Sequence, residues 1–494
     1  MTQRELIKIL DENGLVLKTQ VYENKLDTKI ENITYNSKDC IKNSVFFVKG
    51  KNFKTEYVKD AVSNGAITII SENEYDTDVA GLVIVRDIRR AMVLVANVFF
   101  EKPYEGLKTV GITGTKGKTT TTYFIKNILD EYEQYNNNPK TGVISTVQTY
   151  TGKRDEESHL TTPEAIELQR YFREMVDSGI NYVTMEVSSQ AYKYDRIRNM
   201  TFDVGLFLNI SEDHISDAEH PNFNDYLDSK LEFIKNCRNV VINRETDYYE
   251  AVENAAKNAD KIITYGTEKS KEKSDYYVTN IRNDGEYIVF TVNTKDYSHD
   301  FKIKMKGRFN VENALASIVI SHIHGVPDNI IDKGLLKTEV QGRMNVFTKN
   351  NVTVIVDYAH NKLSFTKLYE SLKADYPQRR IISVGGGPGG KAYARRKDFG
   401  QIVGSNSDFV YLTAEDPQFE AVKSICEEIA SYTKCPYEII EDRKMAIEKA
   451  IGQANPGDVI VLLAKGEETY QKVKGVFVPY ESDLVIAKQL LEMK

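Results

Sequence analysis

Short apolar segments with strand character alternate with segments of helical periodicity through most of the chain. The strand-like segments are rich in Val and Ile and are bounded by Gly, Asp, Asn or Pro, which is typical of buried parallel strands. They cover residues 109–113, 182–187, 204–210, 240–243, 352–357, 380–384, 409–413 and 459–463. This alternation predicts an α/β fold in which helices connect parallel strands. In residues 276–306 apolar and polar positions alternate instead, and we expect an antiparallel excursion there.

Two polar breaks in this pattern predict three domains. The stretch 101–106 contains Pro and Gly and follows a helix-like segment at 91–100. The stretch 337–342 follows a helix-like segment at 311–324 and precedes a new run of strands. We therefore expect domains at residues 1–106, 107–338 and 339–494, each of ordinary domain size.

The composition is that of a globular protein in a reducing compartment. Among 494 residues, 41% are hydrophobic and the charges sum to −7, which disfavours binding to nucleic acid or to an anionic membrane. The four cysteines show neither a disulfide framework nor metal-ligand spacing. The first residues lack the apolar core of a signal peptide, and no apolar run is long enough to span a bilayer. We expect a cytoplasmic protein with no membrane insertion.

The strongest local signal is the sequence GITGTKGKTTTT at residues 111–122, between an apolar strand and a helical segment. Its glycines allow backbone N–H groups to point at a phosphate, and the helix dipole favours negative charge there. The strict P-loop has a glycine where this chain has Ile112, so the match is a variant, and a βα turn without a ligand remains an alternative. The predicted ATP-binding residues of the loop are Gly114, Thr115, Lys116, Gly117, Lys118, Thr119 and Thr120.

Three further polar side chains follow apolar segments. Glu186 ends one strand-like segment and His214 follows another, so either could bind Mg²⁺, although a solvated turn carboxylate and a structural histidine are the simpler alternatives. The sequence Thr-Thr-Pro-Glu at 161–164 is typical of a helix start, with a threonine N-cap and a proline at the first position. Lys230, taken locally, looks like an exposed helical lysine.

Together these segments resemble the Mur ligases, and more closely those of the MurE type. The resemblance spans the whole chain, including residues 33–50, which are similar to the uridine-binding domain of that subgroup. The motifs that carry it occur in the family's order: GITGTKGKTT, LTTPE, TMEVSSQAY, LNISEDH, YLDSK, GRFNVENALA, VQGRMN, DYAHN, LTAEDPQFE and AKGEE.

The resemblance implies an N-terminal uridine-nucleotide-binding domain, a central P-loop ATPase domain and a Rossmann-like C-terminal domain that binds an amino acid. It implies that ATP phosphorylates the γ-carboxylate of D-Glu in UDP-N-acetylmuramoyl-L-Ala-D-Glu, and that an amine attacks the acyl phosphate. Lys118 and Thr119 would hold the γ-phosphate and Mg²⁺. Glu186 and His214 match the family's metal residues. Lys230 matches a lysine that reacts with CO₂ to give a carbamate, a carboxylate that can bind the second Mg²⁺. The implied catalytic residues are Lys118, Lys230, Glu186 and His214.

Further matches to the family assign binding residues. For ATP they are Asn310, Asn313, Arg343 and Asp357. For the uridine substrate and its muramoyl dipeptide they are Ser37, Thr161, Thr162, Ser188 and Arg196. A helix cap or a surface pair is the structural alternative for each.

The C-terminal domain is expected to select the incoming amino acid through Lys391, Glu415, Asp416, Pro417, Gln418 and Glu468. Diaminopimelate-adding relatives have an arginine at the position of Gln418, which pairs the second carboxylate of their substrate. The neutral Gln418 within an acidic segment favours an ammonium side chain, so we predict L-lysine, with L-ornithine and meso-diaminopimelate as alternatives. Lys391 replaces the arginine that clamps the α-carboxylate in the family, and Arg395 or Arg396 could contribute instead.

Other classes of protein remain possible on the residues alone. They include another amide ligase of the same superfamily, such as folylpolyglutamate synthetase, a P-loop kinase or NTPase, and a nucleotide-binding regulator without activity. Within the predicted class we expect a monomer whose partners are ATP, Mg²⁺, the uridine substrate and L-lysine.

Overall fold

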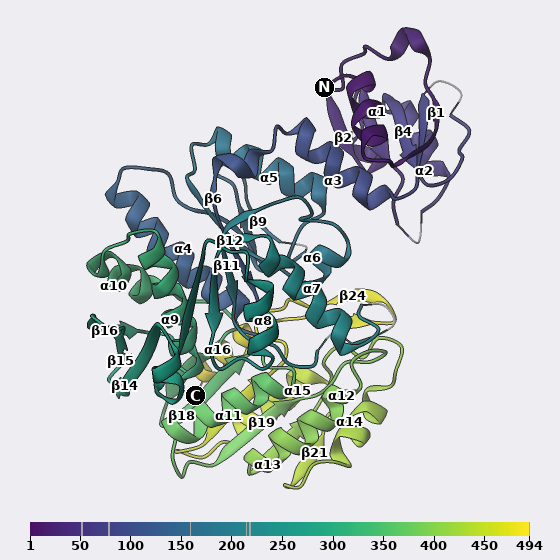
Figure 1. Cartoon of the computed structure of the whole chain (residues 1–494). Helices are drawn as coiled ribbons and strands as arrows, with labels where there is room; N and C mark the ends of the chain where they lie inside the picture. Colours follow the sequence, from purple (N-terminus) through teal and green to yellow (C-terminus); the bar gives the residue numbers. More distant parts are fainter. Residues whose placement is uncertain (51–52, 78–79, 159, 214, 217–218, 494) are drawn as a thin grey trace. The chain divides into compact units, whose positions relative to one another are not determined.

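The computed structural model describes residues 1–50, 53–77, 80–158, 160–213, 215–216 and 219–493, and in it the chain forms two compact units (Figure 1). Unit 1 comprises Met1–Gly111, Glu133–Gly205 and Glu232–Asn239. Unit 2 comprises Ile112–Tyr132, Leu206–Leu231 and Val240–Lys494. The boundaries that the sequence predicts, at residues 106 and 338, stay a prediction.

Unit 1 begins with a sheet of order β1-β5-β4-β3-β2, in which β1 is antiparallel to β5 and the other pairs are parallel. Leu6, Leu10 and Val95 cover one face of this sheet, and Val58 and Ala61 cover the other. Its strands are β1 (Val16–Gln20), β2 (Asn32–Thr34), β3 (Ser44–Phe47), β4 (Ala66–Ser71) and β5 (Gly81–Val85). Its helices are α1 (Gln3–Glu12), α2 (Glu56–Ser63) and α3 (Ile88–Phe99).

The second sheet has the order β16-β15-β14-β13-β12-β11-β6-β10-β7-β8-β9. The pairs β14–β15 and β15–β16 are antiparallel, which confirms the excursion predicted at 276–306. Its strands are β6 (Lys108–Thr113), β7 (Gly142–Ile144), β8 (Gln148–Tyr150), β9 (Asp155–Glu157), β10 (Tyr182–Glu186), β11 (Phe202–Phe207), β12 (Cys237–Asn243), β13 (Lys261–Thr267), β14 (Tyr276–Asp284), β15 (Tyr287–Asn293) and β16 (Ser298–Ile303). The helices of this part of the chain are α4 (Lys118–Tyr135), α5 (Ala165–Asp177), α6 (Ser189–Lys193), α7 (Phe223–Lys235), α8 (Tyr249–Ala255), α9 (Phe309–Ile323) and α10 (Asp328–Lys337).

The third sheet lies in unit 2 and has the order β17-β18-β22-β19-β20-β21. All its pairs are parallel except β17–β18, as expected of a Rossmann-like domain. Its strands are β17 (Asn345–Lys349), β18 (Val352–Asp357), β19 (Ile381–Gly385), β20 (Phe409–Leu412), β21 (Tyr437–Ile439) and β22 (Val459–Leu463), and a hairpin of β23 (Tyr470–Val473) and β24 (Val476–Pro479) follows. The helices are α11 (Lys362–Asp375), α12 (Ala394–Asp398), α13 (Gly404–Asn406), α14 (Val422–Ala430), α15 (Arg443–Gly452) and α16 (Asp483–Met493).

The strands of the third sheet are apolar on both faces because each face packs against helices. Phe365 and Leu368 of α11 and Ile425 of α14 cover one face. Ile447 of α15 and Ile486 of α16 cover the other. Because β18, β19, β20 and β22 are parallel, the loops that follow their carboxyl ends lie at one edge of the sheet. Ligands of open parallel sheets bind at this edge.

No helix among the described residues is long and apolar enough to cross a bilayer.

The buried ion pair between Arg443 and Asp483 links α15 to the start of α16, and both side chains are fully buried. We expect Asp483→Asn to lower the free energy of unfolding by about 3–5 kcal/mol, because the guanidinium would be left buried without its counter-ion. Urea unfolding of the full chain measures this. The control is Glu481→Gln, which removes the partly exposed pair with Lys444 and should cost less than about 1 kcal/mol. Equal losses in the two variants would contradict the prediction.

Candidate active site

The predicted phosphate loop connects the end of β6, at Thr113, to the start of α4, at Lys118. Gly117 has a φ of +86°, and a Cβ there would lie 2.6 Å from Oδ1 of Asn313. Only glycine fits this position, because the backbone is left-handed and packs directly on another side chain. The loop is therefore closed against α9.

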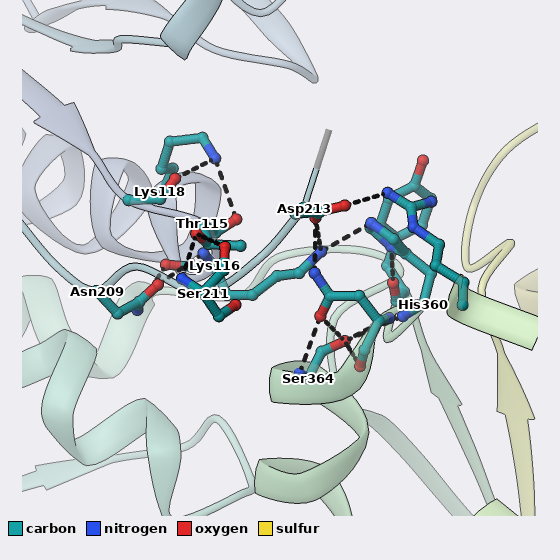
Figure 2. Close-up of polar contacts among 12 residues, drawn as sticks. Thr115, Lys116, Lys118, Asn209, Ser211, Asp213, His360 and Ser364 are labelled. Atoms are coloured by element: carbon teal, nitrogen blue, oxygen red, sulfur yellow. Dashed lines mark hydrogen bonds and ion pairs between the residues drawn. The ribbon is translucent and has the colours of Figure 1, made fainter. Parts of the chain in front are cut away.

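The segment that follows β11 holds the loop in place. Asn209 Oδ1 accepts the N–H of Lys116 at 2.9 Å, and its Nδ2 donates to the Lys116 carbonyl at 3.0 Å (Figure 2). Thr115 Oγ1 accepts the N–H of Ser211 at 3.0 Å and lies 3.0 Å from the hydroxyl of Tyr226 on α7. Side chains from two other segments thus fix the conformation of the loop before any ligand binds.

The lysine and threonines of the loop lie where the sequence predicts them. Lys118 Nζ donates to the carbonyls of Gly114 at 2.9 Å and Thr115 at 3.4 Å. Thr119 and Thr120 are buried in the first turn of α4. A lysine, a hydroxyl and the positive end of a long helix are the groups that bind a polyphosphate and its Mg²⁺.

The two asparagines predicted to bind ATP also adjoin this loop. Asn313 Nδ2 donates to Asn310 Oδ1 at 3.0 Å, and Thr121 Oγ1 donates to Asn313 Oδ1 at 3.3 Å. Both asparagines are buried on α9. The structure therefore brings these two residues next to the phosphate loop.

Lys230 is not the exposed residue that its local sequence indicates, because only 2% of it is exposed. Its Nζ donates to the Gly114 carbonyl at 3.0 Å and lies 4.8 Å from the centre of the Tyr226 ring. Burial, and then the nearby Lys118, hold the pKa of this amine well below its usual value. The spacing of Tyr226, Lys230 and Phe233 places all three on one buried helical face, which is the signal that a purely local interpretation misses.

A polar network joins the phosphate loop to the loop after β18. Lys116 Nζ lies 2.7 Å from Nε2 of His360. His360 Nδ1 donates to the Tyr358 carbonyl at 2.7 Å, and therefore Nε2 is the acceptor in the contact with Lys116. Burial lowers the pKa of Lys116 to about 7, although the carboxylate of Asp213 opposes the shift.

Asp213 is the centre of this network (Figure 2). Its Oδ2 accepts Nδ2 of Asn361 at 2.6 Å, and its Oδ1 accepts a guanidinium N–H of Arg395 at 2.7 Å. The same carboxylate lies 3.6 Å from Lys116 Nζ. Asp213, His360 and Asn361 lie in two of the family-like motifs, LNISEDH and DYAHN, but no role for them was predicted from the sequence.

The residues predicted to contact ATP from the C-terminal domain lie side by side. Asp357 accepts the backbone N–H groups of Met344 and Ala359, each at 2.8 Å. Burial raises the pKa of its carboxyl. The guanidinium of Arg343 lies 4.2 Å from the centre of the Tyr358 ring.

The acidic loop after β20 is already contacted by a cation of the chain itself, Lys465, which follows β22. Lys465 Nζ donates to Asp416 Oδ1 at 3.0 Å and also contacts Glu468. Glu468 in addition accepts the hydroxyl of Tyr358 at 2.6 Å. Lys465, which sequence analysis did not assign, thus neutralises part of the charge that was expected to attract a substrate ammonium.

Glu415 is the buried carboxyl of this loop, and burial raises its pKa to about 7 even though Arg395 opposes the shift. Pro417 is buried beside it, and Gln418 is partly buried with a φ of +53°. The Gln418 backbone pairs with β23, donating to the Lys472 carbonyl at 2.9 Å. Lys391 is exposed.

In unit 1, Glu186 lies at the end of β10 and is buried rather than solvated. Its Oε1 accepts the backbone N–H of Thr146 at 2.9 Å, and its Oε2 accepts the Thr146 hydroxyl at 3.2 Å. Thr161 Oγ1 lies 3.1 Å from the same hydroxyl. His214, the second predicted metal residue, lies outside the described residues.

The residues predicted to bind the muramoyl dipeptide form one network with Glu186. Thr162 Oγ1 donates to the Glu186 carbonyl at 2.9 Å and accepts the N–H of Ser188 at 3.0 Å. Arg196 donates to the Thr162 carbonyl at 3.0 Å and to Glu164 Oε1 at 2.8 Å. Ser37 is buried in the turn after β2.

The prediction of a threonine N-cap at residues 161–164 is wrong. Helix α5 begins at Ala165, its N-cap position is Glu164, and no side chain caps it. The reason is that the Thr162 hydroxyl is engaged with residues 186 and 188. The Glu164 carboxylate is held by Arg196 and by Lys49, at 2.6 Å from the latter's Nζ.

No cluster of three or more metal-ligating side chains occurs within the residues that the structure describes. The predicted oxygen donors, the Thr119 hydroxyl and the Glu186 carboxylate, fit Mg²⁺, because that ion is usually held by one or two protein oxygens together with water and substrate phosphates.

Comparison with protein families gives two matches. Residues 112–321 match the model described as Mur ligase middle domain. Residues 342–466 match the model described as Mur ligase, glutamate ligase domain.

Full-length relatives agree with these matches. The chain is 38% identical to UDP-N-acetylmuramyl-tripeptide synthetase of Lactobacillus delbrueckii subsp. bulgaricus, over 98% of each protein. It is 37% identical to UDP-N-acetylmuramoyl-L-alanyl-D-glutamate--L-lysine ligase of Enterococcus faecalis, over 94% of this chain and 92% of that protein. Identity to the enzyme of that name from Streptococcus pyogenes is 39%, over 93% of each.

Solved structures share the fold at lower identity. MurF from Acinetobacter baumannii is 19% identical, with a TM-score of 0.69 over 99% of this chain and 98% of that one. MurF ligase from Thermotoga maritima, solved in complex with ADP, is 20% identical, with a TM-score of 0.62 over 94% and 96%.

The raised pKa of Glu415 predicts how the stability of the protein changes with pH. The folded state binds a proton at this carboxyl up to about pH 7, whereas the unfolded state releases it near its ordinary value of 4.5. Between these values the folded state holds more protons, and therefore the Glu415 contribution to stability falls as pH rises. We expect Glu415→Gln to be more stable than the parent at pH 8, by up to about 3 kcal/mol, and the advantage to vanish toward pH 4.5.

Urea unfolding at pH 5 and pH 8 measures this difference. The control is Glu427→Gln, at a side chain that is 57% exposed, which should shift stability by the same small amount at both pH values. A Glu415→Gln effect independent of pH would contradict the prediction.

Proposed function

The chain belongs to the Mur ligase family of ATP-dependent ligases, and on this premise we propose that it adds L-lysine to the γ-carboxylate of D-Glu in UDP-N-acetylmuramoyl-L-Ala-D-Glu. The reaction is a step of peptidoglycan synthesis. The observation that carries the proposal is that Lys118 and the buried Lys230 both donate to the carbonyl of Gly114 in the phosphate loop. A phosphate loop alone is common to kinases and NTPases, whereas a second, buried lysine at the same carbonyl matches the carbamylated lysine of this family.

The proposed chemistry has two steps. A carboxylate oxygen of D-Glu attacks the γ-phosphorus of ATP, and ADP leaves. The α-amine of the amino acid then attacks the acyl carbon, phosphate leaves, and the nitrogen loses its proton as the amide forms. Both steps depend on positioning the reactants and neutralising charge, since the protein itself forms no covalent bond to them.

The phosphate loop and α4 supply the contacts to ATP. The N–H groups at the start of α4, together with Lys118, bind the phosphates, and the Thr119 hydroxyl is placed to hold Mg²⁺. When bound, Mg²⁺ neutralises charge on the phosphate oxygens. Asn310 and Asn313 contact the nucleotide from α9. Arg343 and Asp357 contact it from the C-terminal domain.

Lys230 is suited to carbamylation because its burial and lowered pKa favour the neutral amine. Only the neutral amine adds to CO₂: the Nζ–C bond forms, a proton is released, and the product is a carboxylate. That anion would lie beside Lys118 and could bind Mg²⁺, which turns an unfavourable pair of lysines into a favourable ion pair.

In unit 1 we assign the dipeptide to Thr161, Thr162, Ser188 and Arg196. The support is the hydrogen-bond network that these residues form with Glu186, the carboxylate assigned to Mg²⁺ together with His214. The uridine end of the substrate is assigned to the first domain, with Ser37.

The choice of L-lysine rests on the loop after β20 and on the relatives named as L-lysine ligases. Gln418 offers no charge to a second substrate carboxylate. Lys465 balances Asp416 and Glu468 in part, and Glu415 is a third acidic side chain of the same loop. An ammonium side chain fits this balance, and the cytoplasm, where ATP and uridine nucleotides are made, is the expected compartment.

The first test is phosphate release with Mg-ATP and UDP-N-acetylmuramoyl-L-Ala-D-Glu against L-lysine, L-ornithine, meso-diaminopimelate, D-lysine, L-alanine and L-serine. We expect release that requires both the uridine substrate and L-lysine, with L-ornithine about 10- to 200-fold poorer because it lacks one methylene. Release with diaminopimelate would contradict the assignment of the loop. Release without any amino acid would favour a kinase or NTPase.

Replacement of Lys230 tests the carbamate. We expect Lys230→Ala to lower turnover by about 10²-fold or more, and added short carboxylates to restore part of it, because they supply the missing anion. With ¹³C-labelled bicarbonate, a carbamate signal should appear in the NMR spectrum of the parent and be absent from the variant. Lys235→Ala, at an exposed position of the same helix, is the control. Full activity of Lys230→Ala would remove this residue from the site.

A further inference from the structure

The incoming amino acid presents a specific electrostatic problem. Its α-carboxylate and its attacking nitrogen share one carbon atom, so the group that binds this carboxylate must lie close to the phosphate loop, where the acyl phosphate forms. The surrounding loop contains Glu415, Asp416 and Glu468, and a carboxylate placed among them without a cation would be strongly disfavoured. The inference below rests on the proposed function.

Two arginines at this edge of the third sheet are already fully engaged. Arg443 is completely buried and donates to Asp483 and to the carbonyls of Ala414 and Leu463. Arg396 donates to Glu420 at 2.8 Å, to Glu428 at 2.6 Å and to the Pro388 carbonyl at 2.9 Å. All three nitrogens of each guanidinium are thus already hydrogen-bonded within the chain.

Three other basic side chains near this edge are also poorly suited. Lys465 is shared by Asp416 and Glu468. Lys391 is exposed, and its ammonium cannot form the bidentate contact that an arginine makes with a carboxylate. Arg343 stacks on Tyr358, beside Asp357, and is assigned to ATP.

Arg395 differs from all of these. Its side chain is 15% exposed, and one guanidinium nitrogen donates to Asp213 at 2.7 Å. Its Nε is buried and has no hydrogen-bond partner among the described residues. A buried N–H without an acceptor is costly, so this group is prepared to receive one.

The position of Arg395 also meets the distance requirement. The carboxylate of Asp213, which binds Arg395 through Oδ1, lies 3.6 Å from Lys116 in the phosphate loop (Figure 2). Arg395 is therefore separated from that loop by one carboxylate, and Glu415 also contributes to its electrostatic environment.

We propose that Arg395 binds the α-carboxylate of the incoming amino acid, with Nε as one of its donors, and that Asp213 is the positioning residue that aims the guanidinium. In this chain Arg395 thus takes over the function that an arginine at position 391 has in related enzymes.

The test compares L-lysine with L-lysinamide, which differs only in lacking the α-carboxylate. In the parent enzyme we expect kcat/KM to favour L-lysine by about 10²-fold or more. In Arg395→Met this ratio should fall at least about 10-fold, through a higher KM for L-lysine, while the KM values for ATP and the uridine substrate change by less than about twofold. Lys391→Met tests the rival assignment, and its ratio should stay that of the parent. Comparing ratios between variants cancels the intrinsic difference in reactivity between the two amines.

Three results would overturn the proposal: an unchanged ratio in Arg395→Met, loss of the ratio in Lys391→Met, or a rise in the KM for ATP instead of that for L-lysine, which would assign Arg395 to the phosphoryl group. If Arg395→Met does not fold, Arg395→Lys is used instead. Its ratio should be intermediate, because lysine keeps the positive charge but cannot make the bidentate contact of arginine. If the parent uses another amino acid, that substrate and its amide replace the lysine pair. The proposal on Arg395 and the assignment of L-lysine therefore fail separately.

Discussion

The buried carboxylate of Asp213 holds the candidate site of unit 2 in place. It is almost fully buried, and it holds together groups from three segments: Lys116 of the phosphate loop, Asn361 at the N-cap of α11, and Arg395 of α12. A buried carboxylate is stable only when cations and N–H donors surround it, and these donors come from the loop between β6 and α4 and from the segments after β18 and β19. The two halves of the proposed reaction are thereby fixed relative to each other by one side chain.

Charge balance decides what this edge of the third sheet can bind. Arg443 and Arg396 have acceptors at all three of their guanidinium nitrogens, and the acids Asp416 and Glu468 share Lys465. An amino acid with an ammonium side chain brings one negative and two positive groups before its amine is deprotonated. The site offers complementary groups for each: a guanidinium with an unused donor, and carboxylates in excess over their cations.

The fold was predictable from sequence where strands are buried on both faces. The segments at 352–357 and 459–463 are strands of a sheet that helices cover on both faces, which makes most of their positions apolar. Sequence analysis did not predict the hairpin of β23 and β24, because its exposed residues Val476 and Phe477 follow no burial pattern. It also assigned no strand to the three-residue β7, which is too short for periodicity to show.

The site was predictable where function is encoded by neighbouring residues, as in the phosphate loop. It was not predictable where contacts join distant positions. His360 meets Lys116 across 244 residues of chain, and Arg395 meets Asp213 across 182. For the same reason the Thr162 hydroxyl looked like a helix cap and Lys230 like a surface residue. The partners of these two side chains lie in other segments of the chain, and only the folded structure brings them into contact.

The backbone of Gln418 has a consequence for how substrate choice can evolve in this protein. The residue occupies a left-handed conformation, and its N–H and carbonyl are both tied to the hairpin, at Lys472 and Lys474. Branched side chains such as Val, Ile or Thr are strained at such a φ, and a change in loop length would break the pairing with β23. Substitutions at position 418 are therefore limited to residues whose side chains are not branched at Cβ, with the backbone unchanged. Under the proposed function, a change of amino-acid substrate that needs more than such an exchange would require compensating mutations in the hairpin.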